Sequence, residues 1–398
     1  MPQHEAFKGR WAVAACFFVN GFMVGSWAPQ IPLLVARFSL SESVLGLLIL
    51  LVGVGAVTAM PVCGYLMSRY GSRTVLRVAG LLCAGSLLVV ALAPAMAVLS
   101  VALIAFGGLI GGMDVSMNAN AVAVERRLGR AIMSSSHGFW SLGGFVGAGL
   151  GGVLAEEWGY LAHAVAVTAI ALPLVAAALP HLIVEEKRAP SAGGRFAGFP
   201  KSPGVYLVGL VALMCMIPEG AVLDWAALYL RQEMGASLAV ASLAFTAFSG
   251  TMALMRFLGD RVRDRLGAVK TMRLSGIIAA LGMLGAGISP SPLVATLAFA
   301  LSGLGVANLV PIAFSAAGNQ PGISSAAGMS VATTIGYSGL LAAPSLIGFV
   351  AETTGFAPIF IAFAMVLGLI SLTSNLMRPA DAILSQPAAD RKPAISGP

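Results

Sequence analysis

Charged side chains are scarce in this sequence. Asp, Glu, Lys and Arg make up only 10% of the 398 residues, whereas hydrophobic residues make up 58%. A water-soluble protein of this length could not bury so much apolar side chain in a core. The composition therefore excludes a soluble globular protein and predicts an integral membrane protein.

Residues that carry enzyme or metal chemistry are equally few. The four cysteines, at positions 16, 63, 83 and 215, lie in apolar segments without metal-ligand spacing. The sequence contains no G-x-S-x-G, no H-E-x-x-H and no Cys/His cluster. The letters G-x-G-x-x-G at 147–152 follow no strand and precede no suitably placed acid, which excludes a dinucleotide site. We therefore expect no enzyme activity, no metal and no cofactor.

Long apolar runs recur along the whole chain. They are about twice as long as the strands of a membrane barrel and lack alternation, so they indicate helices. The predicted fold is all-α, with twelve transmembrane helices in two pseudo-symmetric bundles of six. The expected spans are 11–36, 44–67, 75–93, 97–124, 134–157, 160–183, 204–230, 240–258, 271–288, 292–318, 323–350 and 356–377.

The positions of the basic residues predict the orientation. With the N-terminus in the cytoplasm, only Arg37 and Arg231 of the 23 lysines and arginines lie outside. Both termini are then cytoplasmic. The net charge of +7 reflects topology and contact with anionic lipid, and nothing supports binding to nucleic acid. The run Trp11–Ala36 is too long for a signal peptide and is expected to remain as the first span.

One long polar connection, Glu185–Gly204, divides the spans six plus six. It predicts an N-terminal bundle at 1–184, a cytoplasmic linker at 185–203, a C-terminal bundle at 204–378 and a disordered cytoplasmic tail at 379–398.

The two halves also share sequence. GYLMSRYGSRTVLR at 64–77 aligns with DRVRDRLGAVKTMR 196 positions later, and GGVLAEEWGY at 151–160 aligns with IGFVAETTGF at the same offset. This pattern indicates duplication of a six-helix unit. Transporters built from such repeats alternate the access to a site between the halves.

The loop G-x-x-x-S-R-x-G-x-R at 64–73 resembles the loop signature of the major facilitator superfamily. GGMDVSMNANA at 111–121, SSSHGFWSLGG at 134–144 and PEGAVLDWAALYL at 218–230 resemble its bacterial MosC-like branch. The resemblance implies a monomeric transporter of the bacterial inner membrane whose first, fourth, seventh and tenth spans line a central cavity. It implies little about the solute.

A cytoplasmic gate is predicted around the repeated basic loops. The family motif has an Asp where this chain has Ser68, whereas the C-terminal copy keeps Asp264. A carboxylate against a helix N-terminus contributes about 0.3–1 kcal/mol when exposed. We expect Asp264 or Asp260 near the start of the fifth span at 134–136, unless these acids are merely soluble loop charges. The complete predicted gate is Arg69, Arg73, Asp260, Asp264 and Arg265.

The fifth span carries glycines between Gly143 and Gly152 that resemble the motif of drug–proton antiporters, although Ala148 replaces its proline. The alternative is close helix packing through Gly143, Gly147 and Gly151. Export by proton antiport therefore remains an alternative to uptake.

Three acids, Asp114, Glu219 and Asp224, lie inside predicted spans. A charge at the bilayer centre costs at least about 2.5–3.5 kcal/mol. Since no span offers an obvious basic partner at comparable depth, we expect these groups to be protonated or to face a water-filled cavity. Glu219 and Asp114 are the predicted proton-coupling residues.

The seventh span separates its two acids. Pro218 can kink the helix there, and Glu219 and Asp224 project about 140° apart on a regular helix. Glu219, near mid-depth, suits proton transfer. Asp224 beside Trp225 suits a substrate or an outer gate, or both residues could simply lie at the membrane interface.

The predicted substrate-binding residues share polar or aromatic side chains on the expected cavity-lining spans or beside them. They are Asn20, Trp27, Asn118, His137, Asp224, Trp225 and Asn308. Asn118 could equally serve only as the hydrogen-bond partner of Asp114, and His137 as a capping or packing residue. Tyr337 and Thr333 are interpreted as packing residues.

The sequence thus predicts a secondary active transporter that moves a small polar solute by alternating access, coupled to protons through intramembrane carboxylates. The alternatives are an antiport exporter of drugs or amphipathic metabolites and, in another class, a transport-like membrane sensor without flux.

Overall fold

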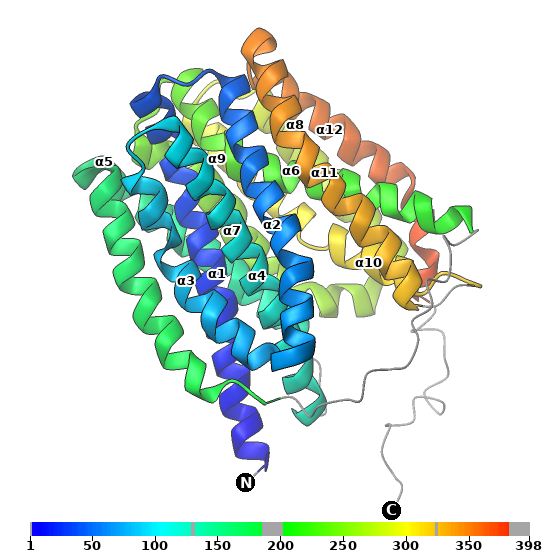
Figure 1. Ribbon diagram of the computed structural model, residues 1–398. Helices are drawn as coiled ribbons and strands as arrows, with labels where there is room; N and C mark the ends of the chain where they lie inside the picture. Colours follow the sequence, from blue (N-terminus) through cyan, green and yellow to red (C-terminus); the bar gives the residue numbers. More distant parts are fainter. Residues whose placement is uncertain (1, 129–131, 185–201, 323–324, 382–398) are drawn as a thin grey trace, which may run out of the picture.

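The computed structural model describes residues 2–128, 132–184, 202–322 and 325–381, and this part of the chain is helical with no strand. The bounds of the helices are α1 (Pro2–Phe38), α2 (Glu42–Tyr70), α3 (Ser72–Leu92), α4 (Met96–Leu128), α5 (Met133–Ala178), η1 (Leu179–His181), α6 (Pro203–Gln232), α7 (Leu238–Leu266), α8 (Ala268–Gly287), α9 (Pro292–Val306), α10 (Leu309–Gly318), α11 (Ser325–Thr354), α12 (Ala357–Leu372) and η2 (Ser374–Asp381). The helices pack side by side, and those of the C-terminal half, such as α6 and α11, are inclined to α1–α4 (Figure 1).

The apolar spans agree with the twelve-helix prediction. In the described chain, ten helices are long and apolar enough to cross a membrane, and α12 together with η2 makes eleven. Helix α5 holds two spans, because Gly159 interrupts it with a φ of 80°. The predicted tenth span is a helix pair, α9 and α10, that breaks at Ala307–Asn308.

The backbone repeats in the same register as the sequence. Gly71 and Gly267, 196 positions apart, turn the chain with φ of 81° and 77°. Gly159 and Gly355 have the same spacing and φ of 80° and 75°. Left-handed φ values of this kind are open to glycine at little cost. The two halves therefore make the same turns at the same places, as expected of a duplicated unit.

The turns define two ends of the bundle. We call the end with Gly71 and Gly267 the basic face, because the arginine-rich loops lie there, and the end with Gly159 and Gly355 the opposite face. In Figure 1 the N-terminus lies at the basic face, at the bottom of the view.

The halves touch mainly along two helix pairs, α5 with α7 and α2 with α11, and α1 also contacts α6 and α7. The α2–α11 contact lies toward the opposite face, where the Ser345 hydroxyl donates to the Gly46 carbonyl at 3.3 Å. Closer to the basic face, Gly64 has no atom within 4 Å of where a Cβ would be. Figure 1 shows α2 and α11 diverging in that direction.

Helix α5 is packed on two sides through small residues. A Cβ on Gly143 would lie 2.1 Å from the Phe18 carbonyl oxygen of α1, and one on Gly147 would lie 2.4 Å from that of Phe22. The other side of α5 meets α7, where a Cβ on Gly152 would lie 2.4 Å from Ser242 Cβ. The glycines therefore allow close packing, which supports the structural alternative for this motif.

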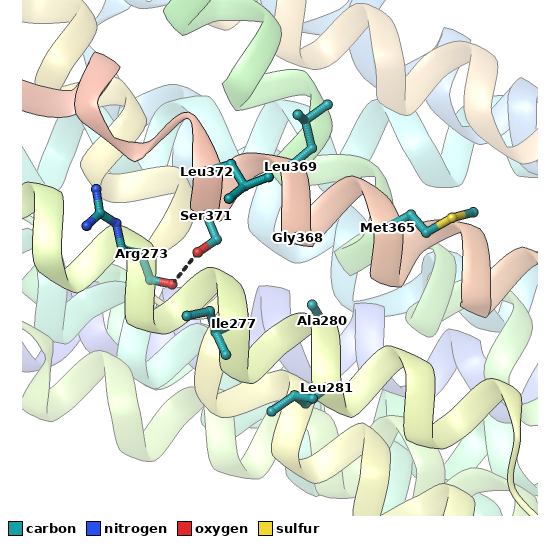
Figure 2. A pocket seen from close by; sticks show the side chains of 9 residues that line it. All are labelled: Arg273, Ile277, Ala280, Leu281, Met365, Gly368, Leu369, Ser371 and Leu372. Atoms are coloured by element: carbon teal, nitrogen blue, oxygen red, sulfur yellow. Dashed lines mark hydrogen bonds between the residues drawn. The ribbon is translucent and has the colours of Figure 1, made fainter.

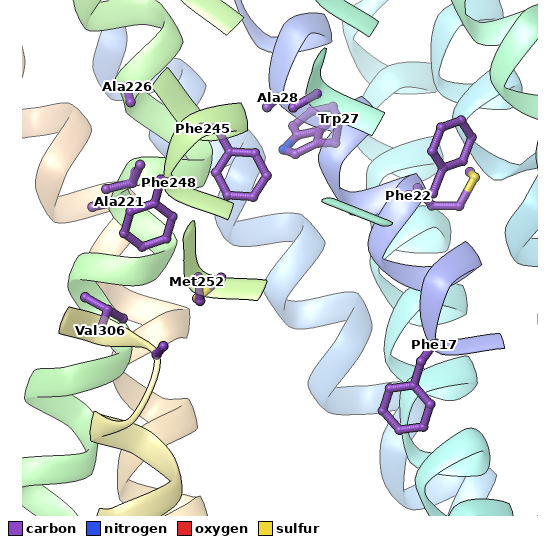
Figure 3. Close-up of a cluster of buried hydrophobic side chains, with 14 of the residues drawn as sticks. Phe17, Phe22, Trp27, Ala28, Ala221, Ala226, Phe245, Phe248, Met252 and Val306 are labelled. Atoms are coloured by element: carbon purple, nitrogen blue, oxygen red, sulfur yellow. The ribbon is translucent and has the colours of Figure 1, made fainter. Parts of the chain in front are cut away.

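An apolar core joins the halves around these contacts. Figure 3 shows aromatic side chains of α1 and α7 in one cluster, among them Phe22, Trp27, Phe245 and Phe248, each at most 3% exposed. Close packing of this kind fixes the helices of the site relative to one another.

The chain ends differ slightly from the sequence expectation. Helix η2 continues to Asp381, whose carboxylate accepts the Ala268 backbone N–H at 2.5 Å. Residues 379–381, assigned to the disordered tail, are therefore ordered against the start of α8. The rest of the predicted tail and the linker residues 185–201 lie outside the described residues.

Candidate functional site between the two halves

An ion pair lies where the two halves meet. Arg256 of α7 donates from Nη2 to Glu219 Oε1 of α6 at 3.2 Å. Its Nη1 donates to Ser141 Oγ of α5 at 2.6 Å, and its guanidinium lies 5.9 Å from the Trp140 ring centroid. Arg256 therefore connects the acid of the C-terminal half to the N-terminal half.

The expectation that Glu219 has no basic partner is wrong. The sequence places Arg256 at the end of the span 240–258, as a membrane-surface residue. Helix α7 instead continues to Leu266, so Arg256 is an interior residue of the helix, and its side chain is only 12% exposed. The polar sequence after Leu258 conceals the length of this helix.

Asn20 extends the polar contact into the N-terminal half. It is 1% exposed, donates to the Ile110 carbonyl of α4 at 3.1 Å and accepts the Trp140 indole N–H at 2.9 Å. A buried amide whose donor and acceptor are both used fixes the groups around it. Asn20 therefore orients Trp140 beside Arg256, which makes it a support of the site as well as a cavity candidate.

Asp114 has a different environment. Its Oδ1 and its backbone carbonyl accept from Asn118 Nδ2 at 3.2 Å and 2.9 Å, one turn along α4. Both side chains are half-buried. Tyr337 of α11 lies within electrostatic range of Asp114 and also of Glu219. Tyr337 therefore senses the charges of both predicted proton-coupling acids.

Tyr337 was interpreted from the sequence as a packing residue, and it is half-buried on α11. The electrostatic influence of carboxylates from both halves makes it a further candidate for the site. The eleventh span carries no charge near Tyr337 that would single it out. Thr333, one turn away, donates to the Met329 carbonyl at 2.8 Å.

Asp224 and Trp27 meet across the halves. Helix α6 is continuous through Pro218, so Glu219 and Asp224 leave it in different directions. The Trp27 side chain of α1 lies near the Asp224 carboxylate, to which its indole N–H can donate. Trp27 and Asp224 are 3% and 9% exposed. Two predicted substrate-binding residues therefore form a contact between α1 and α6.

Trp225 is enclosed by protein and is not exposed as a membrane-interface residue would be. It is 1% exposed and packs against Phe356 with ring centroids 5.4 Å apart. This burial removes the interfacial alternative for Trp225. It also shows that Trp225 and Asp224 make separate contacts.

His137 and Asn308 lie on either side of this region. His137 of α5 is half-buried, packs edge-on to Phe17 at 5.1 Å and lies within electrostatic range of Arg256. Asn308 lies at the α9–α10 break, 7% exposed, and its Nδ2 has no hydrogen-bond partner in the described chain. His137 thus belongs to the Arg256 surroundings, whereas Asn308 faces Gly259.

Among the described side chains, the predicted contact of Asp264 with the start of α5 is absent. Asp264 is exposed, and no hydrogen bond or ion pair joins it to the other described side chains. Ser135 and Ser136 instead accept from Arg10, at 2.7 Å and 3.4 Å. Arg265 is exposed, and the side chain of Asp260 lies outside the described residues.

The N-terminal gate arginines make local contacts. Arg73 donates to the Pro180 carbonyl at 3.3 Å, and Arg69 lies over the ring of Tyr70 at 5.5 Å. Neither contact crosses between the halves.

Two polar contacts join span ends of the two halves at the opposite face. The Glu156 carboxylate of α5 accepts the backbone N–H of Ala239, at the start of α7. Gln232, at the end of α6, donates to Glu42 Oε1 of α2 at 3.0 Å. These acids lie at span ends, where the sequence offers no reason to separate them from ordinary loop charges.

The chain matches the family model of the Major Facilitator Superfamily over residues 13–218 and 207–395. It belongs to the Major Facilitator Superfamily. The two overlapping matches correspond to the two repeats, and the resemblance suggested by the loop at 64–73 is confirmed.

Relatives that match over most of their length support the same family assignment. An uncharacterised MFS-type transporter of Yersinia pestis is 36% identical over 353 residues, covering 88% of this chain and 91% of the relative. Membrane protein MosC of Rhizobium meliloti is 34% identical over 345 residues, covering 86% of this chain and 84% of the relative. This superfamily member is therefore similar to the MosC-like branch over most of its length.

Solved structures share the fold. A D-xylose–proton symporter superposes with a TM-score of 0.71 at 15% identity, over 93% of this chain and 97% of that one. A mutant form of the nucleoside transporter NupG gives 0.75 at 14% identity, over 92% of this chain and 99% of that one. At such identities the likeness concerns the fold alone.

Proposed function

We propose that this superfamily member is a secondary transporter of the bacterial inner membrane that moves a small polar solute together with protons. Glu219 is the proton carrier in this proposal. The observation that carries it is the Glu219–Arg256 ion pair, 3.2 Å long, whose arginine also holds Ser141 of the other half.

The pair couples protonation to the contact between the halves. While Glu219 is ionised, Arg256 is held between α6 and α5. When Glu219 takes a proton, its negative charge is lost and the attraction to the guanidinium with it. Arg256 then keeps its contacts with Ser141 and Trp140. A proton therefore changes a contact that must break when one half rocks against the other.

The neighbouring groups suit a small polar solute. Asp114, Asn118 and Tyr337 supply a carboxylate, an amide and a phenol, and Trp140 supplies an aromatic face. A few polar groups among apolar walls orient a ligand by hydrogen bonds. Hydroxyl or amine groups, as in sugars, polyols and amines, match this set. Asp114 binds the solute in this scheme.

The arrangement of contacts supports a state closed at the opposite face. The Trp27–Asp224 and Ser345–Gly46 contacts both cross the halves away from the basic face. We assign the basic face to the cytoplasm, since the arginines gather there. The solute site then communicates with the cytoplasm, and the proposed lock through Asp264 or Asp260 forms only in the alternate state.

Proton uptake with the solute is preferred to antiport. The glycines from Gly143 to Gly152 are explained by the packing of α5 between α1 and α7, so they give no independent support to an exporter. The ion pair itself is compatible with either direction.

Flux into proteoliposomes tests the proposal. A thermal-shift screen of the purified protein against sugars, polyols and amines first selects a solute. We expect labelled solute to accumulate when the outside is made acidic, and to equilibrate without accumulation when the pH gradient is collapsed. Glu352→Gln, at an exposed acid outside the site, is the matched control and should behave as wild type.

Two results would contradict the proposal. Solute accumulation that is independent of the pH gradient would show that transport is not coupled to protons. Binding without any flux would favour a sensor.

A further inference from the structure

A groove of about 750 Å³ lies on the outer side of the C-terminal half, between α8 and α12. It shares no lining residue with the Glu219–Arg256 pair, and apolar side chains make up most of its wall. Figure 2 shows Arg273 at one end and Met365 at the other, with Ile277, Leu281 and Leu369 between them.

The floor of the groove is made by small residues. Gly368 of α12 has no atom within 4 Å of where its Cβ would be, and Ala280 faces it from α8. The larger side chains at the rim project into the membrane: Leu281 is 56% exposed, Met365 68% and Leu369 49%. The groove is therefore open toward the lipid, where an acyl chain would cover exposed methyl and methylene groups.

A positive charge lies at one end. Arg273 is six residues into α8, about 8 Å from its start at the basic face. It is exposed, and its Nε donates to Ser374 Oγ at 3.1 Å. In the described chain its terminal guanidinium nitrogens have no hydrogen-bond partner. Ser371 also fixes the helix pair here by donating to the Arg273 carbonyl at 2.9 Å (Figure 2).

The repeat supplies an internal comparison. Arg77 occupies the equivalent position of the N-terminal half, 196 positions earlier. It is half-buried and donates from both Nε and Nη2 to the Leu179 carbonyl at 3.3 Å. Its guanidinium therefore caps the end of α5. Arg273 has the same place in the fold but keeps its terminal nitrogens available.

We infer that the α8–α12 groove binds one anionic phospholipid, with the phosphate at Arg273 and an acyl chain along Ile277, Leu281 and Leu369. Charge complementarity favours this occupant, because a cation beside an apolar groove near the basic face matches a lipid headgroup followed by its chain. A soluble solute would find few hydrogen-bonding groups along the groove. The inference does not depend on proton coupling.

The bound lipid would hold α12 and η2 against α8. The end of η2 already contacts α8 through Asp381 and Ala268. A headgroup at Arg273, beside Ser374, adds a contact at the same junction. The lipid should therefore stabilise the C-terminal half.

Lipid binding is measured by native mass spectrometry of the purified protein titrated with phosphatidylglycerol or phosphatidylcholine. Wild type should retain one phosphatidylglycerol in preference to phosphatidylcholine. Arg273→Gln should lower that preference about fivefold, the factor equivalent to the ~1 kcal/mol of one basic residue near an anionic surface. Gly368→Leu places a side chain on the floor, where a Cβ has no atom within 4 Å, and should reduce retention of both lipids. Arg77→Gln is the matched control and should keep the preference.

Equal retention of the two lipids by wild type would overturn the inference, and so would an unchanged preference in Arg273→Gln. A loss shared by Arg77→Gln and Arg273→Gln would also overturn it, because the effect would then follow net charge and not the groove. The thermal midpoint in phosphatidylglycerol nanodiscs, compared with phosphatidylcholine, gives a second readout that should fall in Arg273→Gln alone.

Discussion

The two halves treat their membrane-embedded acids differently. Asp114, in the N-terminal half, has an amide partner one turn away on its own helix. Glu219, in the C-terminal half, has a guanidinium from another helix that also contacts the opposite half. An amide can remain bound whether or not the acid is protonated, whereas an ion pair requires the charge. On this comparison we propose solute binding for Asp114 and proton-dependent movement for Glu219.

The difference arises although the backbones of the two halves repeat each other. The turns at Gly71 and Gly267 are equivalent, but the site residues are not. At the offset of 196 positions, Glu219 corresponds to Met23, Arg256 to Met60 and Asp114 to Val310. Duplication therefore preserved the residues that set the backbone, while the polar residues of the site arose separately in each half.

The largest effect is expected from Arg256→Leu. It leaves the Glu219 carboxylate without its partner in a partly buried position, and breaking such a pair costs about 3–5 kcal/mol. We expect a strong loss of thermal stability, measured as the fraction that remains monodisperse after heating in detergent.

The double variant Glu219→Leu/Arg256→Leu should recover most of that loss, because it removes both charges. If the single and double variants are equally unstable, Arg256 stabilises the fold through other contacts. The ion pair with Glu219 would then not explain the effect.

Trp27→Phe should have the next largest effect. It removes the indole donor to Asp224, and a hydrogen bond to a charged group contributes about 1.5–3 kcal/mol. The closed opposite face should then open more often. A cysteine placed at the buried Ala28 should react at least several-fold faster with an impermeant maleimide added from that side. An unchanged rate would show that this contact does not close the face.

Asp114→Asn is expected to act on binding alone. The amide keeps the size of the side chain and part of its hydrogen bonding, so folding should be unaffected, whereas solute affinity should fall about tenfold, equivalent to ~1.4 kcal/mol. The dissociation constant by calorimetry checks this. Proton coupling measured per solute transported should not change. A loss of proton coupling with unchanged solute affinity would contradict this, because it would make Asp114 the proton carrier.

The sequence predicted the arrangement of the helices better than the contacts of the functional site. Apolar length and the repeated glycines located the spans and the break at Gly159, because lipid and left-handed turns leave few alternatives. Asp114, Glu219 and Asp224 were recognised because a charge inside an apolar run is conspicuous.

Asn118 was anticipated as the partner of Asp114 on the same helix, but partners from other helices were not recognised. Arg256 lies where the hydrophobic signal of the span fades, although the helix continues, and Tyr337 looks like any aromatic residue of a core. Which helices meet between two halves depends on tertiary packing, and no local pattern records it. The predicted gate at Asp264 likewise belongs to a contact that this conformation does not contain.

The most direct measurement compares two activities of Glu219→Gln in proteoliposomes, accumulation driven by a pH gradient and exchange of labelled for unlabelled solute. A glutamine cannot release a proton but leaves the solute site in place. The account predicts that accumulation is lost while exchange continues near the wild-type rate. Retained accumulation would contradict it, as would an equal loss of both activities in a protein that remains folded.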